Sequence, residues 1–506
     1  MPSMAPYSAR RLPVRKRLSS TNALAGILFL ALGGCAVGPD YSEPASTLSK
    51  FHSADALSSR AATAPVPQID RWWEGFNDPE LTRIVRRTLE QNLDLAAALG
   101  RVEQARAAAH EAGAQLLPSI DLSAQVRRQR QSLESPAGAI ARHLPGYDRN
   151  QSLYDVGAAA SWEADLFGGL GRAAEAASAE AQAAEAARLG IRISVAADAA
   201  DAYFRILGDQ ARIAVANDQV ATDTHLLDLV QRRFAKGLST DREVAQAEAL
   251  LAGARASLQP LRIDLEGQLN RLDVLMGMQP GSYAGSLTER VIIPSPPAIT
   301  GAAPTDLLRR RPDIVAAERR LAASNARIGA AIADYYPKFS LSALLGFESS
   351  KAGDLFFRST TFQPQGLLGL RWRLFDFGKV DAEVDAAKGA EAEDLARYRQ
   401  SVLHAAEDVE NAFTALVQFE ENVKERTHEV AALRRARDLS QSAYQTGVIP
   451  LTDVLDANRQ LLSAEDALVQ AKTDVSRSAV SAFRALGGGW SPDLTALSEV
   501  ANARDN

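Results

Sequence analysis

The stretch YDVGAAASWEADLFGG (154–169) alternates small or apolar side chains with polar ones before it ends in two glycines. Val156 and Trp162 fall on one face of an extended chain, whereas Glu163 falls on the other. Alternation of this kind is typical of a β-strand with one apolar and one polar face. It predicts a strand over 154–167.

The end of this stretch has a counterpart later in the chain. The segments SWEADLFGG (161–169) and RWRLFDFGK (371–379) carry Trp, Phe and Gly at the same three positions, 210 residues apart. Earlier in each half the spacing is 219 residues, with Pro118 paired to Pro337. The difference places a longer loop in the first copy, and the repetition predicts an internal duplication.

Each copy predicts two strands, which gives four per chain: 119–130, 154–167, 338–348 and 366–376. Their lengths suit tilted strands that cross a bilayer. A soluble sandwich would show the same alternation, but four strands can neither cover a two-layer core nor close a barrel, which needs about eight. In a membrane several copies must pool their strands, because open sheet edges leave backbone groups unpaired in lipid.

Segments rich in Ala, Glu, Gln, Arg and Leu predict helices around the strands. The longest, 172–234 and 380–444, would each span about 95 Å, a length for which a globular domain has no use. Shorter helices flank them in two repeats: 88–117 and 241–276 within 88–277, and 304–336 and 451–486 within 304–487. The remaining segments have the composition of linkers and irregular structure: 35–87, 278–303 and 488–506.

The N-terminus carries a processing signal. Five Arg and Lys residues precede ALAGILFLAL (23–32), which is too short to span a bilayer and predicts a secretory signal over 1–34. The run ends in LGGC and so resembles a bacterial lipobox, in which Cys35 would receive diacylglycerol on sulfur and palmitate on nitrogen. An ordinary export signal with a buried Cys35 is the alternative.

Composition argues against catalysis and metal binding. The chain has one cysteine, and its six histidines are scattered without the spacing of a zinc-binding helix. The segments FGGLG (167–171) and LGGGW (486–490) lack the Lys and Ser or Thr of a phosphate loop. We expect no enzyme, no metal, no cofactor beyond the lipid, and no nucleic-acid partner.

Four motifs carry a resemblance to a known family: WWEGFNDPEL (72–81), 307–347, YQTGVIPLTDVLDANRQLLSAE (444–465) and RALGGGW (484–490). With the lipobox, they make the chain similar to TolC-like outer membrane factors of the lipoprotein (NodT-type) branch. The resemblance implies a homotrimeric, mixed α/β membrane protein, with a trimeric α-helical barrel and a twelve-stranded transmembrane β-barrel. It also implies an equatorial girdle, built here from 35–87, 278–303 and 488–506.

This family supplies the exit ducts of tripartite efflux pumps. The resemblance implies passive conduction of drugs or other small molecules from an inner-membrane RND-type pump and a periplasmic adaptor (membrane fusion) protein. It implies a lipid-anchored outer membrane location, a long periplasmic portion and a role in antibiotic resistance. Metal efflux and protein secretion stay open. A periplasmic adaptor or a coiled-coil scaffold would lack the four amphipathic strands.

The two turns that join each long helix to its successor, 232–248 and 442–459, are the expected functional regions. Each contains a glycine suited to the left-handed residue that ends a helix. Adaptor docking is expected at Gly237, Leu238, Gly447 and Val448.

The family's periplasmic gate maps onto the same turns. Tyr444, Asp453 and Asp456 match family positions that hold the closed aperture. Ile449 stands where the family has an arginine, so the resemblance implies a hydrophobic and acidic ring in place of the arginine latch. The repeat places Glu243 opposite Asp453. The alternative for these acids is a helix N-terminal charge that complements the dipole; acidic rings would give weak cation preference.

Overall fold

A computed structural model gives the structure of the chain and describes residues 36–45, 49–53, 67–283, 287, 292–299, 310–354 and 358–490. The expected signal peptide and Cys35 lie outside these residues, as do 304–309 of an expected helix and 491–506 of the tail. The described chain forms two compact units. The first contains 36–41, 110–176 and 325–389, and the second contains the rest.

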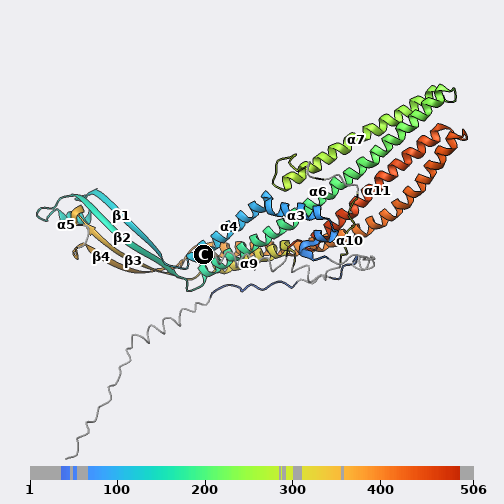
Figure 1. The fold of residues 1–506 in the computed structure, drawn as a ribbon. Coiled ribbons are helices and arrows are strands. Elements are labelled where there is room, and N and C mark those ends of the chain that lie inside the picture. Colours follow the sequence, from blue (N-terminus) through green and yellow to red (C-terminus); the bar gives the residue numbers. More distant parts are fainter. Residues whose placement is uncertain are drawn as a thin grey trace, which may run out of the picture. The chain divides into compact units, whose positions relative to one another are not determined.

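The first unit holds a four-stranded antiparallel sheet in the order β1-β2-β3-β4 (Figure 1). Its strands are β1 (Ser119–Arg130), β2 (Asn150–Ala164), β3 (Lys338–Ser349) and β4 (Phe362–Arg371). A short helix, α5 (Pro136–Ala141), lies in the longer loop expected for the first copy. Sheet neighbours are also sequence neighbours, so β1 and β4 are left as the two edges.

The strand register confirms that apolar residues share one face. Leu122 lies opposite Ala158, which in turn lies opposite Leu345 on β3. The side chain of Leu122 is 81% exposed and that of Leu368 is 76% exposed. This face is therefore apolar, and no described segment of the same copy covers it.

Two strands end earlier than the sequence predicts. The expected strands ended at residues 167 and 376, but β2 ends at Ala164 and β4 at Arg371. Beyond each strand end, an aspartate side chain accepts a hydrogen bond from a backbone amide near the start of the following helix. Asp165 accepts one from the Gly171 amide (2.7 Å), and Asp376 accepts one from the Val380 amide (3.0 Å). These bonds turn the chain into the long helices.

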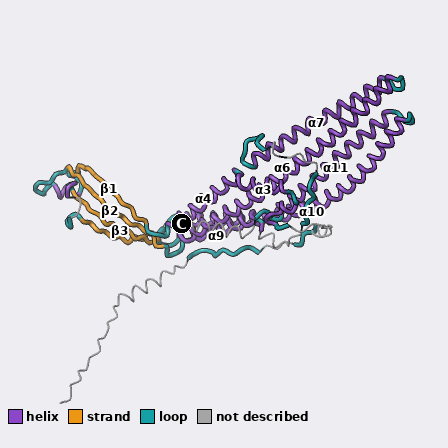
Figure 2. Tube along the Cα trace, viewed as in Figure 1, coloured by secondary structure: helices purple, strands orange, loops and turns teal. Residues whose placement is uncertain are grey.

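The helices confirm the duplication. Two helices have 67 residues, α6 (Gly169–Ala235) and α10 (Lys379–Gln445), and each is followed by a 35-residue helix, α7 (Asp241–Leu275) or α11 (Leu451–Ala485). A 67-residue helix is about 100 Å long. Figure 2 shows the two helical hairpins of the second unit. No described helix has an apolar stretch long enough to cross a membrane.

The helix expected over 88–117 is in fact two helices, α3 (Pro79–Gln91) and α4 (Leu93–Ala114). Asn92 separates them because its backbone is extended and its side chain accepts hydrogen bonds from the next amides, at Asp94 (3.0 Å) and Leu95 (3.1 Å). In the second copy α9 (Pro312–Ala333) begins at the proline.

The segment before residue 88 is more ordered than its composition predicts. It contains a 3₁₀-helix, η1 (Ile69–Phe76), whose Trp72 stacks on Phe483 with ring centroids 5.3 Å apart. Asp78 caps α3 and accepts a hydrogen bond from the Tyr203 hydroxyl (2.9 Å). The motif WWEGFNDPEL therefore packs this segment onto the helical hairpins.

Arg311 ends a basic run directly before Pro312 but does not lie on a solvated surface. The residue is buried and its guanidinium donates to Asp313 (2.6 Å), Asp408 (2.9 Å) and the Ala485 carbonyl (3.1 Å). Burial lowers the pKa of Arg311 and the two carboxylates raise it, with a net increase. This arginine joins α9, α10 and α11.

Candidate gate at the helical turns

The two turns after the long helices have the same backbone geometry. In the first, the Leu238 amide bonds to the Arg233 carbonyl (2.9 Å) and the Gly237 amide to the Phe234 carbonyl (2.8 Å). In the second, the Val448 amide bonds to the Ala443 carbonyl (2.9 Å) and the Gly447 amide to the Tyr444 carbonyl (3.0 Å). Both are Schellman motifs.

The glycines supply the left-handed residue of each motif. The φ angle is +70° at Gly237 and +78° at Gly447, as the sequence predicts. Apart from the glycine and its two chain neighbours, no residue has an atom within 4 Å of where a Cβ would be at either position. The next residues, Leu238 and Val448, are 64% and 75% exposed. Each turn therefore presents an apolar side chain to solvent directly after its glycine, at matching positions.

The helices that follow the turns begin differently. Thr240 and Glu243 form a capping box at the start of α7, in which the Thr240 amide donates to the Glu243 carboxylate (2.8 Å). That carboxylate also accepts from the Ser239 hydroxyl (2.7 Å). The Ser239 bond, followed by the Thr240 amide, lowers the pKa of Glu243. Pro450 starts α11 without any side-chain cap.

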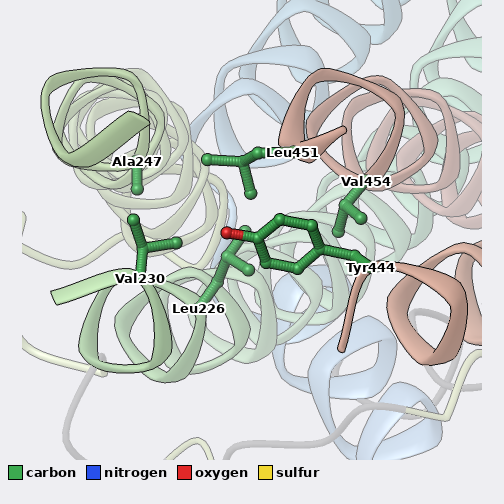
Figure 3. Packing of buried hydrophobic residues seen from close by; sticks show 6 residues of the cluster. All are labelled: Leu226, Val230, Ala247, Tyr444, Leu451 and Val454. Atoms are coloured by element: carbon green, nitrogen blue, oxygen red, sulfur yellow. The ribbon is translucent and has the colours of Figure 1, made fainter. Parts of the chain in front are cut away.

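A buried apolar cluster lies beneath both turns and contains Leu226, Val230, Ala247, Tyr444, Leu451 and Val454 (Figure 3). It draws on α6, α7, α10 and α11, so it joins the ends of the two hairpins. Ile449 is partly buried and packs against this cluster. In one copy of the chain, Ile449 therefore supports the turn from inside.

Arg233 is a site residue that the sequence reasoning missed. Its guanidinium carbon lies 4.7 Å from the centroid of the Tyr444 ring. Its Nη1 donates to the carbonyls of Tyr444 and Gln445, each at 3.3 Å. A cation at the last carbonyls of α10 also complements the helix dipole. Arg233 thus fastens the first turn to the second.

A signal for Arg233 was present in the repeat. The 210-residue spacing aligns Arg233 with Ala443, so the first copy has an arginine where the second has a small side chain. Nothing in the sequence alone showed that this arginine reaches across to Tyr444. Burial and then the negative charge of Glu243 raise the pKa of Tyr444.

The acids of the second turn are accessible. Asp453 is exposed in the first turn of α11, and Asp456 is partly exposed. Asp456 pairs with Arg459 and accepts a hydrogen bond from the Gln460 amide group (2.6 Å). Among the described residues no ion pair or hydrogen bond joins either aspartate to Glu243. Glu243 serves its own helix end, whereas Asp453 and Asp456 are accessible to solvent, Asp456 while paired with Arg459 on the same helix.

Comparison with known proteins identifies relatives over most of the chain. A family model described as outer membrane efflux protein matches residues 84–278 and 303–488. The pyoverdine export outer membrane protein OpmQ of Pseudomonas aeruginosa is 33% identical over 86% of this chain and 91% of its own. The solvent efflux pump outer membrane protein SrpC of Pseudomonas putida is 30% identical over 91% and 97%. The solved outer-membrane channel OprN superposes with a TM-score of 0.81 and 33% identity, over 90% of this chain and 100% of its own.

Proposed function

The chain belongs to the outer membrane efflux protein family, and we propose that three copies of it form the exit channel of a tripartite pump. It is an outer membrane component of an efflux system. In the proposal the trimer conducts small molecules passively, and an inner-membrane RND-type pump supplies the energy through a periplasmic adaptor. A channel of this kind needs no catalytic group.

The sheet is the observation that carries this proposal. It has four strands and, among the residues that the structure describes, an uncovered apolar face and two edges without partners. Such edges are unfavourable in lipid, and joining β1 of one copy to β4 of the next would remove them. Three sheets would give twelve strands, which closes a barrel wide enough for a channel.

Conductance in planar bilayers tests the proposal. The full-length protein, purified in detergent as a trimer, should insert and give discrete conductance steps with weak cation preference, because acidic side chains concentrate cations in a narrow pore. Trimers that insert without conducting would contradict channel function. Anion preference would contradict only the acidic aperture.

We also propose that Cys35 carries the lipid anchor. The residues that follow it support this proposal, because they are held at the start of α6. The Val37 amide bonds to the Phe167 carbonyl (3.1 Å), and a Cβ on Gly168 would lie 2.8 Å from the Ala36 Cα. Asp40 pairs with the buried Arg172 at 2.6 Å. A lipid on Cys35 would enter the membrane at the end of the sheet where the long helices begin.

Mass spectrometry of the mature N-terminus tests this assignment. The expected N-terminal peptide begins at Cys35 and carries diacylglycerol and one further acyl chain. Cys35→Ser should remove both and lower the yield of trimer more than it alters the conductance of any trimer that forms. An unmodified N-terminus would contradict the anchor.

The periplasmic mouth is proposed at the two turns. Asp453 and Asp456 would be repeated by threefold symmetry into acidic rings, and Arg233 would hold the hairpins together in the closed state. The exposed Leu238 and Val448 suit docking of an adaptor's helical hairpin. The relatives' names point to cargoes as different as pyoverdine and solvents, so we assign cargo choice to the pump.

A further inference from the structure

The β1 side chains on the apolar face of the sheet change from apolar to cationic near the β1–β2 loop. Side chains two residues apart share a face, so Ile120, Leu122 and Val126 lie in one row with Arg128 and Arg130. The register places Arg128 opposite Ser152 and Arg130 opposite Asn150. Both arginines are exposed.

Aromatic side chains mark the level at which this change occurs. On the same face, Tyr154 lies opposite Val126, and the rings of Phe347 and Phe362 lie 5.6 Å apart. Eight residues further along their strands, Trp162 and Phe339 mark the other border. Eight residues span about 27 Å along a strand and about 20 Å after tilting, close to the apolar height of a membrane barrel. Arg128 and Arg130 therefore lie just beyond one aromatic girdle, at head-group level.

The two faces of the sheet carry different charges. Arg128 and Arg130 are the only charged strand residues of β1–β4 on the apolar face, and both are positive. The opposite face carries both signs: Asp121, Arg127, Asp155, Glu163, Lys338, Glu348 and Arg371. In the described part of the chain no ion pair or hydrogen bond engages the guanidinium of Arg128 or Arg130.

A neighbouring copy would not neutralise these arginines either. β1 is an edge strand, and the strand that would join it, β4 of the next copy, contains no carboxylate. The strands on either side of β1 therefore offer this positive charge no carboxylate on the apolar face, which leaves it open to groups of the surrounding membrane. Guanidinium groups bind phosphate through paired hydrogen bonds.

We propose that Arg128 and Arg130 bind the phosphate groups of glycolipid head groups in the leaflet around the β1–β2 loop. The inference rests on the proposed function, which places this loop at the outer surface because both long helices begin at the other end of the sheet. Each trimer would hold three such sites, one at each junction between copies. The bound glycolipids would line the seams of the barrel.

Binding of lipid A to the purified full-length trimer tests the proposal. Native mass spectrometry would compare bisphosphorylated lipid A with its dephosphorylated form, and inorganic phosphate would serve as competitor. We expect the phosphorylated form to bind at least tenfold more tightly, and the double variant Arg128→Gln/Arg130→Gln to lose that preference. Millimolar phosphate should not displace the lipid, because the acyl chains contribute to binding.

The double variant Arg127→Gln/Arg371→Gln is the matched control, since it removes two charges from the opposite face. It should keep the preference for phosphorylated lipid A. Equal loss in both variants, or equal binding of both lipids by the unchanged protein, would overturn the proposal. The lipid comparison on the unchanged protein stands even if a variant fails to fold. Conductance of the same trimers reports separately on channel function.

Discussion

The turns at 232–248 and 442–459 have one backbone geometry but are held in different ways. The first carries a capping box at Thr240, and its Arg233 donates a hydrogen bond to the Tyr444 carbonyl of the second turn. The second starts its next helix at Pro450 without a side-chain cap and leaves two aspartates accessible. The duplication thus supplies the fold, and the departures from it mark the residues on which a gate could depend.

Removing the bridge between the turns should have the largest effect. Arg233→Ala deletes the contact with the Tyr444 ring and the bonds to two helix-terminal carbonyls, together about 2 kcal/mol or more. If these contacts hold the closed state, its population relative to the open state falls about thirtyfold. Single-channel recordings should then show a raised resting conductance. Arg233→Lys should be intermediate, because lysine keeps the charge but not the planar fork.

The neighbouring arginine provides the control. Arg232 is exposed and pairs with Asp228 on its own helix. Arg232→Ala should therefore leave the resting conductance unchanged. If both alanine variants open the channel equally, the bridge between the turns is not the cause.

Removing the acids of the second turn should have the next largest effect. Asp453→Ala together with Asp456→Ala shortens the side chains proposed to narrow the aperture and frees Arg459 from its partner. We expect a several-fold higher resting conductance, greater antibiotic leak and a weaker cation preference. Glu425→Ala, an exposed acid elsewhere on α10, should change none of these. Unchanged conductance and selectivity in the double variant would remove both aspartates from the gate.

Straining the backbone of the turns should have a smaller effect, equal in the two turns. Gly237→Ala and Gly447→Ala each place a Cβ in open space but in a left-handed backbone conformation, which costs about 1–2 kcal/mol. Thermal unfolding of the helical part should shift by a few degrees in each variant. A large shift in only one of them would show that the two turns differ in more than their side-chain contacts.

The capping box should have the smallest effect. Thr240→Ala should cost about 1 kcal/mol, whereas Pro450→Ala removes no side-chain cap. Because the folded-state pKa of Glu243 is lowered, its stabilising contribution is present above its ordinary pKa and is lost as pH falls through the lowered value. Glu243→Gln should flatten the acid limb of a stability curve measured by circular dichroism. An unchanged acid limb would contradict the role of this cap.

Most of the architecture could be predicted from sequence because its signals are local. Alternation around Trp162 and the glycines of both turns depend only on residues close in sequence, and the 210-residue repeat needs only a comparison of the two halves of the sequence. The structure confirms all three. Strand ends were predicted less well, since Asp165 and Asp376 stop the strands through hydrogen bonds made several residues later. Composition also concealed the order of the segment around Trp72, which depends on stacking with a distant phenylalanine.

The candidate gate was predicted only in part. Resemblance and repeat located the turns and their acids, but they could not show that Glu243 is occupied by its own cap or that Ile449 packs inward. Arg233 acts across more than two hundred residues of sequence, on Tyr444. Contacts of that range appear only when the hairpins are placed side by side.

Cross-linking between the sheet edges tests the central claim most directly. Within one copy, Leu122 on β1 and Leu368 on β4 have two strands between them and lie at least about 14 Å apart, too far for a disulfide. A series pairing Leu122→Cys with Gly366→Cys, Leu368→Cys or Leu370→Cys allows for the register between copies. The account predicts that at least one pair yields covalent dimers and trimers under denaturing conditions. Monomers throughout the series would contradict a barrel pooled from several chains.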